Sequence, residues 1–285
     1  MKPAAFEYCR PDTVEEAIAL LAEFGGDANV LAGGMSLGAM LNMRLARPAA
    51  LVDIKRIPGF DAVSVNGEAR TGATLTQARA LEHTALMRAV PLLGLALPWT
   101  GHFQTRNRGT LAGSVAHADP SAETPLVLAT LDGEVELASA RGTRRLRARE
   151  FFVDVMTTAR EPDELVTALI WPKAGAATRH AFAEIAQRHG DFAIVACAVA
   201  AEVDASGRLR ALSLGLGGVE SRPLVADTAA FLGERADRAL AGAIAAAAAE
   251  RVDPLNDHKA SADYRRALVR TLGAQVLAQA FKTDS

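Results

Sequence analysis

The sequence is poor in residues that bind metals. Only two of its 285 residues are cysteines, Cys9 and Cys197, which lie far apart and form no CxxC pair. Neither a disulfide framework nor a cysteine-ligated cluster or zinc site can be built from them. The six histidines form no HxH or HxxxH pair, so each is expected to be a surface or hydrogen-bonded residue. We therefore expect no metal site and no iron–sulfur cluster in this chain.

The sequence also lacks a charge excess and a long apolar run. The formal net charge is −2 and the charged residues are spread along the chain, which gives no electrostatic footprint for nucleic acid. The longest featureless apolar stretch, Ala239 to Ala249, is well short of the ~20 residues that cross a bilayer. The start, MKPAAFEYCRP, lacks a basic stretch followed by an apolar run. These features predict a cytoplasmic protein with no membrane span.

The first 55 residues have the pattern of a compact βαβ unit. Residues 12–24 have helical spacing with a capping signal at their start. A short strand at 29–31 leads into a glycine turn, followed by a helix at 37–45 and a buried strand at 51–54. A strand, glycine turn, helix and strand within about 25 residues is close to the βαβ size range.

A second α+β region follows. The Asn66-Gly67 pair predicts a hairpin within 62–73. The next expected elements are helices at 76–81 and about 121–131 and strands at 134–137 and 165–170. Residues 172–177 are expected to form a linker.

The remainder predicts a separate α+β domain. Residues 181–187, 193–203 and 208–215 predict three strands of an antiparallel meander. Alanine-rich stretches at 224–232, 238–252 and 261–281 predict helices packed on one face of that sheet.

Two glycine-rich segments can bind an anion. The first is Ala32-Gly33-Gly34-Met35-Ser36, where two glycines let the backbone approach a pyrophosphate and the following helix offers free N–H groups. The second, Arg106 to Ser114, combines glycines and hydroxyls with two arginines. For each loop the alternative is a packing turn, and for the arginines a solvated loop. Two such loops favour a dinucleotide whose pyrophosphate is gripped from both sides.

Two further segments are candidates. In Asp119-Pro120-Ser121-Ala122-Glu123, Asp119 can cap a helix, and Glu123 is either a first-turn acid or an acceptor for ribityl or ribose hydroxyls. In Arg188 to Ala193, Phe192 is either a core residue or a cover for a planar ring. The residues alone leave both alternatives open.

These segments, in this order and spacing, resemble the flavoprotein (medium) subunits of the molybdenum hydroxylases, which include carbon monoxide dehydrogenase and bacterial xanthine dehydrogenase. The resemblance covers essentially the whole chain. It is carried by the strings LAGGMSLGAMLNMRLARPAALVDI, TGATLT, RNRGTLAGSVAHADPSAETPLVLATLDGEVEL and RHGDFAIV.

The resemblance implies an α+β fold class in two domains. Residues 1–175 would form a two-subdomain FAD-binding fold of the vanillyl-alcohol oxidase (PCMH) type, with subdomains of about 1–55 and 56–175. Residues 176–285 would form the C-terminal domain of this flavoprotein family, an α+β domain with a three-stranded antiparallel sheet and helices.

The resemblance also implies the residues that contact FAD. The first loop would bind the pyrophosphate and the second would close on it from the other side, Glu123 would hold ribityl hydroxyls, Asp191 and Phe192 would lie near the isoalloxazine, and Val166 would make a backbone contact. Met35 stands where the wider fold often has histidine, which favours non-covalent FAD. Ala112 stands where relatives usually have glycine. The complete expected set is Ala32, Gly33, Gly34, Met35, Ser36, Thr110, Gly113, Ser114, Glu123, Val166, Asp191 and Phe192.

The implied role is electron transfer inside a heteromer. Such subunits receive electrons from two [2Fe-2S] clusters on a small partner, while substrate is hydroxylated at a molybdenum cofactor on a large partner. No catalytic residue is expected in this chain, because no convergent set of His, Cys and carboxylate groups is present. The alternatives are a stand-alone FAD-dependent oxidoreductase of the same superfold, such as a reductase acting on a nucleotide sugar, and a non-redox scaffold whose glycine loops only pack.

Overall fold

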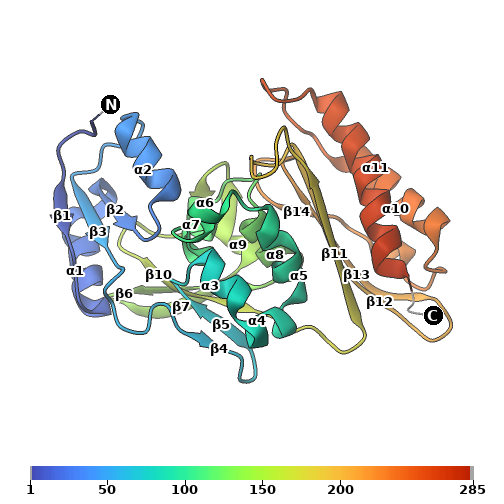
Figure 1. Cartoon of the computed structure of the whole chain (residues 1–285), viewed down its shortest axis with the longest axis horizontal. Coiled ribbons are helices and arrows are strands. Elements are labelled where there is room, and N and C mark those ends of the chain that lie inside the picture. Colours follow the sequence, from blue (N-terminus) through green and yellow to red (C-terminus); the bar gives the residue numbers. More distant parts are fainter. Residues whose placement is uncertain (1, 283–285) are drawn as a thin grey trace.

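The computed structural model describes residues 2–282, and its N-terminal part is a small parallel α/β unit (Figure 1). Its three strands lie in the order β1-β3-β2, with both outer strands parallel to β3. Strand β2 continues through a glycine turn into α2 and then β3, so the predicted strand, turn, helix and strand are present. The bounds are β1 Glu7–Cys9, α1 Val14–Phe24, a 3-10 turn η1 Gly25–Asp27, β2 Ala28–Leu31, α2 Met35–Asn42 and β3 Ala50–Asp53.

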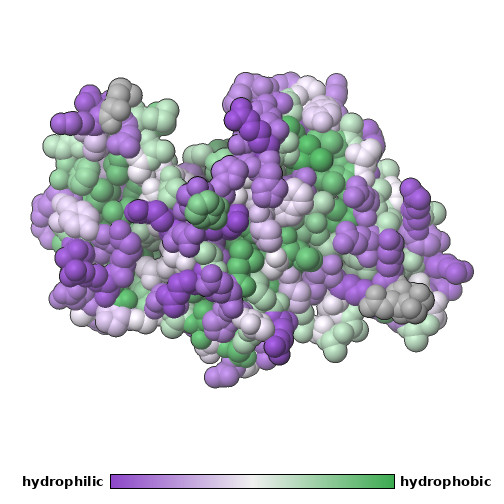
Figure 2. All heavy atoms as spheres, viewed as in Figure 1, coloured by the Kyte–Doolittle hydropathy of each residue, from purple (hydrophilic) through white to green (hydrophobic). Residues whose placement is uncertain are grey.

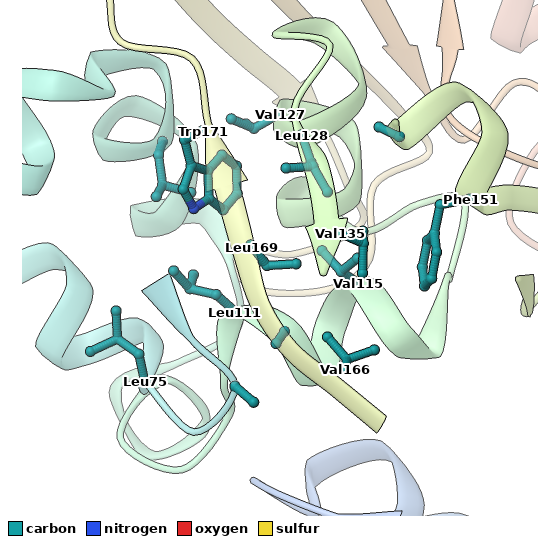
Figure 3. Packing of buried hydrophobic residues seen from close by; sticks show 14 of the residues in the cluster. Leu75, Leu111, Val115, Val127, Leu128, Val135, Phe151, Val166, Leu169 and Trp171 are labelled. Carbon is teal, nitrogen blue, oxygen red and sulfur yellow. The ribbon is translucent and has the colours of Figure 1, made fainter. Parts of the chain in front are cut away.

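The second subdomain is built on a five-stranded antiparallel sheet in the order β4-β5-β10-β6-β7. Its middle strand, β10, is buried at every residue, and Figure 3 shows Trp171, Leu169 and Val166 along it, packed among helical side chains. The indole N–H of Trp171 donates to Thr71 Oγ1 at 2.9 Å, which satisfies the polar atom of this buried ring. The strands are β4 Val63–Ser64, β5 Ala69–Gly72, β6 Glu134–Ser139, β7 Gly142–Arg147 and β10 Leu165–Trp171.

Short helices connect these strands and build the walls of the later site. Thr110 caps one of them, α7, by accepting from the Gly113 N–H at 2.9 Å. The elements are α3 Gln77–Glu82, α4 Thr84–Ala89, α5 Pro91–Ala96, η2 Leu97–Trp99, α6 Phe103–Arg106, α7 Leu111–His117, α8 Glu123–Thr130, α9 Ala148–Phe151, β8 Phe152–Asp154 and β9 Thr157–Thr158.

The C-terminal domain is an antiparallel sheet between two layers of helices (Figure 1). Helices α10 and α11 cover one face, and α5 and α8 of the second subdomain pack on the other. Ser213 Oγ on β13 donates to Thr130 O at the end of α8 at 2.6 Å, which ties the two parts together. The elements are β11 Thr178–Ile185, β12 Val195–Val203, β13 Leu209–Gly217, β14 Leu224–Val225, η3 Ala229–Phe231, α10 Arg238–Arg251 and α11 Ala262–Phe281.

The sequence prediction was wrong for residues 224–232, which do not form an α-helix. They form the two-residue strand β14, which adds a fourth strand to the three expected ones, and the 3-10 turn η3. The Ala226 N–H donates to Leu214 O and Thr228 Oγ1 donates to Leu212 O, so sheet hydrogen bonds outweigh the helical composition. Among residues 2–282, no helix is both long and apolar enough to cross a bilayer.

Candidate functional site

A cleft of about 330 Å³ lies where the two N-terminal subdomains meet, and we call it the central cleft. Figure 2 shows the molecular surface hollowed beside the N-terminal subdomain. Eleven of the twelve residues expected to contact FAD line this cleft, and Asp191 does not. Its volume falls within the range of small-molecule sites, roughly 300 to 1,000 Å³. Loops that lie far apart in the sequence therefore form the walls of one cleft.

The two glycine loops touch each other. A Cβ on Gly33 would lie 2.3 Å from Arg108 O and 2.9 Å from Gly109 Cα, so only glycine fits at this crossing. Gly34 has φ +71° and serves as the N-cap of α2 in the left-handed conformation. The first turn of α2 therefore begins in the cleft wall, and its N–H groups give that wall a preference for anions.

Backbone hydrogen bonds tie the second loop to the segment around Leu75 and Gln77. The Gln77 N–H donates to Gly109 O at 2.8 Å, and the Leu111 N–H donates to Leu75 O at 3.1 Å. Ala112 is buried in the first turn of α7 and lines the cleft, where its methyl group occupies space that glycine would leave open. A loop fixed on both sides in this way presents a preorganised surface to a ligand.

The arginine that lines the cleft is not one of the two considered from the sequence. Arg106 Nη1 donates to Thr100 O and Gly101 O at 2.9 and 2.8 Å, so this side chain braces a turn. Arg108 contributes its main chain at the Gly33 crossing, and neither arginine lines the cleft. Arg160 does line it, and burial lowers the pKa of its guanidinium, against the opposing charges of Glu164 and Asp163.

Glu123 brings a buried carboxyl group to the cleft. It is the first residue of α8 and only 3% exposed. Burial raises its pKa to about 7, while its own backbone N–H opposes that rise. Asp119 does not cap α8 as expected: Ala122 is the N-cap, and Asp119 Oδ1 accepts from the Ser121 N–H at 2.8 Å in the preceding turn.

The turn between β11 and β12 carries Phe192 to the cleft. Gly190 in this turn has φ +89° and packs against the main chain of Gly101, and His189 stacks on Trp99 with ring centroids 5.5 Å apart. Phe192 lines the cleft at 44% exposure. Asp191 is exposed and does not line the cleft, and its N–H donates to Arg188 O within the turn.

Several lining residues were missed from the sequence, and two of them carry unpaired polar atoms. Within residues 2–282, Gln77 Oε1 and Thr100 Oγ1 are buried and have no hydrogen-bond partner. Both residues line the cleft. Buried polar atoms normally have partners, so these two fit a site that binds a molecule rich in hydroxyl and N–H groups. Arg160 was missed as well, because no glycine lies near it in the sequence.

Comparisons with known proteins agree with this geometry. Residues 4–174 match the family model of the FAD-binding domain in molybdopterin dehydrogenase, and residues 180–280 match that of the CO dehydrogenase flavoprotein C-terminal domain. The 6-hydroxypseudooxynicotine dehydrogenase complex subunit alpha of Paenarthrobacter nicotinovorans is 37% identical over 98% of this chain and 96% of its own.

Two solved structures are similar along nearly the whole chain. A chain of carbon monoxide dehydrogenase from Hydrogenophaga pseudoflava superimposes with a TM-score of 0.95 at 32% identity, covering 99% of both chains. A chain of quinoline 2-oxidoreductase from Pseudomonas putida 86 gives a TM-score of 0.94 at 34% identity, covering 99% of this chain and 98% of its own.

Proposed function

Because the chain belongs to the FAD-binding medium subunits of the molybdenum hydroxylase family, we propose that it carries electrons between subunits of a heteromeric oxidoreductase. It receives them from [2Fe-2S] clusters on a small partner and delivers them to an external acceptor, while a large partner holds the molybdenum cofactor. The observation that carries this proposal is the central cleft, where two glycine loops meet backbone to backbone.

The residues of the cleft divide the binding of FAD among them. The first turn of α2 and Ser36 bind the pyrophosphate on one side, and Thr110, Gly113 and Ser114 close on it from the other. Glu123 accepts hydrogen bonds from ribityl hydroxyls. Phe192 packs near the isoalloxazine, and Val166 supports it through its backbone. Asp191 is left out of this assignment because it does not line the cleft.

Binding is non-covalent in this proposal. Met35, at the position where the wider fold often has histidine, offers a thioether that forms no link to the flavin. Neither cysteine lines the cleft within the described part of the chain, and Cys197 is fully buried.

FAD supplies the redox chemistry when bound, and this chain's residues bind it, orient it and tune its surroundings. Two cysteines in the whole sequence are too few for the four ligands of a [2Fe-2S] cluster, so the clusters belong to another chain. Residues 2–282 also contain no group of three or more His, Cys, Asp and Glu side chains with metal-site geometry.

The names of the relatives support the separation of electron transfer from substrate recognition. The similar chains belong to proteins named for carbon monoxide, quinoline and 6-hydroxypseudooxynicotine, yet two of them superimpose on this chain almost completely. Substrates this different are recognised elsewhere in such complexes. We infer the same for this protein.

The experiment compares the purified chain with the complex isolated from its native host. The chain alone takes up one FAD and turns yellow, yet oxidises no organic substrate; the complex, with large and small partners, does. A chain that stays colourless with added FAD would contradict the binding proposal. A chain that oxidises substrate alone at a useful rate would contradict the subunit role and favour a stand-alone oxidoreductase.

A further inference from the structure

A lysine of the C-terminal domain lies over the aromatic ring at the mouth of the central cleft. Lys259 Nζ is 5.7 Å from the ring centroid of Phe192, which is within the distance of a cation–π interaction. Lys259 belongs to the connection between α10 and α11, far from Phe192 in the sequence. Phe192 lines the cleft, whereas Lys259 is half-buried and does not line it. Lys259 therefore contacts the ring without entering the cleft.

The backbone around Lys259 is fixed by side chains of its own turn. Asp257 Oδ1 accepts from the N–H groups of Lys259 and Ala260, at 2.9 Å each. The Asp257 N–H donates to Ala260 O at 3.1 Å, which closes the turn. Asn256 Oδ1 accepts from the Ala262 N–H at 2.8 Å and so ties the turn to the first residue of α11. The position of Lys259 is thus set before any ligand binds.

The buried side chain of Arg265 joins this turn to the strand that follows Phe192. Arg265 lies near the start of α11 and is 4% exposed. Its Nη2 donates to Asp257 Oδ2 at 2.8 Å, and its Nη1 donates to Ile194 O at 2.5 Å, just after Phe192 in the sequence. Nη1 also donates to Gly218 O at 2.7 Å, at the end of β13. One guanidinium therefore fixes both the turn and the backbone beside the ring through charge-assisted hydrogen bonds.

We propose that Lys259 is a positioning residue of the FAD site, which holds the ring of Phe192 at the mouth of the cleft in the orientation that packs on the bound cofactor. Phe192 is 44% exposed, so its ring retains freedom to rotate, and an attractive contact with a fixed cation reduces the freedom that binding must remove. The acid nearest to Lys259 in the sequence, Asp257, pairs with Arg265 at 2.8 Å, which leaves the ammonium group to the ring. The inference rests on the proposed function.

The test is a double-mutant cycle on the FAD dissociation constant of the full chain, measured by flavin fluorescence. Lys259→Met removes the ammonium group at similar side-chain length, and Kd is expected to rise roughly 2- to 5-fold, the value of an exposed cation–π contact. Lys259→Arg keeps a cation over the ring and restores most of the affinity that Lys259→Met loses. Phe192→Leu weakens binding by itself, and adding Lys259→Met to it causes no further loss. The matched control is Lys173→Met, the same charge change at an exposed position outside the cleft.

Urea unfolding of the apo chain gives a readout that needs no flavin. Lys259→Met is expected to lower the folding equilibrium constant only when Phe192 is present, and an apo cycle without this coupling overturns the contact. The positioning role is also wrong if Lys259→Met leaves Kd unchanged, if Lys173→Met raises Kd as much, or if Lys259→Arg restores nothing. A loss that persists in the Phe192→Leu background shows that the charge acts on FAD directly, which overturns it as well.

Failure of the proposed function has a different signature. If the wild type binds no FAD, the proposed function fails, and the apo cycle alone decides the contact between Lys259 and Phe192. If Phe192→Leu does not fold, the comparison of Lys259→Met with Lys259→Arg and Lys173→Met decides the inference.

Discussion

Replacing Gly33 by alanine forces apart the two loops that form the central cleft. The new Cβ would lie 2.3 Å from Arg108 O, and contacts between Cβ and other atoms are essentially never closer than 3.0 Å. The loops must therefore separate by about 0.7 Å, and by about 1.1 Å for a contact of 3.4 Å. The obstacle is backbone, and the hydrogen bonds of Gly109 and Leu111 to the Leu75–Gln77 segment hold that backbone in place.

The size of the effect follows from the cost of overpacking. Inserting one methyl group into a close-packed contact costs about 1 to 3 kcal/mol. If the loops must be close together to bind FAD, this cost is added to the binding free energy and raises Kd roughly 5- to 150-fold. Separated loops hold the pyrophosphate less closely, so affinity for FAD falls together with the free energy of unfolding.

The assay is a fluorescence titration of the apo chain with FAD, combined with thermal unfolding with and without FAD. Gly38→Ala serves as the matched control, since Gly38 lies in the same helix α2 with nothing within 4 Å of its added Cβ. We expect Gly38→Ala to bind as the wild type does. Unchanged affinity in Gly33→Ala would refute the assignment of the crossing to the cofactor site.

Four further outcomes are expected. Gly190→Ala, at φ +89° and with its Cβ 3.0 Å from the Gly101 main chain, loses about 1 to 3 kcal/mol of unfolding free energy in urea and binds FAD more weakly, because the Phe192 turn shifts. Ala118→Gly relieves a left-handed alanine at φ 53° and gains up to about 1 kcal/mol in the same assay. The pKa of Glu184 is raised in the folded chain, so its contribution to stability is full below the ordinary value of 4.5 and falls by up to about 1.4 kcal/mol per pH unit toward about pH 8. Thermal melts of Glu184→Gln are expected to show a smaller fall that ends near pH 7, because only Glu123 then contributes it. Acid precipitation releases all flavin into the supernatant; yellow colour left in the pellet would contradict non-covalent binding.

The elements with strong local signals were predicted well from the sequence. Strand β2, the glycine turn, α2 and β3 follow from spacing and glycine alone, because apolar periodicity and φ > 0 positions are local properties. The segment 224–232 has helical composition, yet long-range hydrogen bonds to β13 decide its structure.

The site shows the same division between local and long-range signals. From the sequence, the glycine at position 33 was explained by the close approach of a pyrophosphate. The structure adds a second reason, because the backbone of the second loop passes so close that even a methyl group would clash with it. Arg106 has the expected positive charge, but its guanidinium donates hydrogen bonds to the carbonyl groups of Thr100 and Gly101 and does not line the cleft. No local sequence pattern predicts the roles of Arg160, Gln77 and Glu184, because these roles depend on neighbours that lie far away in the sequence.

The residue at the mouth of the central cleft, Phe192, belongs to the C-terminal domain, while the other lining residues belong to the FAD-binding domain. A molecule that binds in the cleft therefore contacts both domains and stabilises their association. By linkage, the free energy of this stabilisation equals the difference in binding free energy between the chain with associated domains and the chain with separated domains. The connecting segment at 172–177 contains Lys173 at an exposed position. The rate of tryptic cleavage after Lys173 is therefore expected to fall as the cleft is occupied.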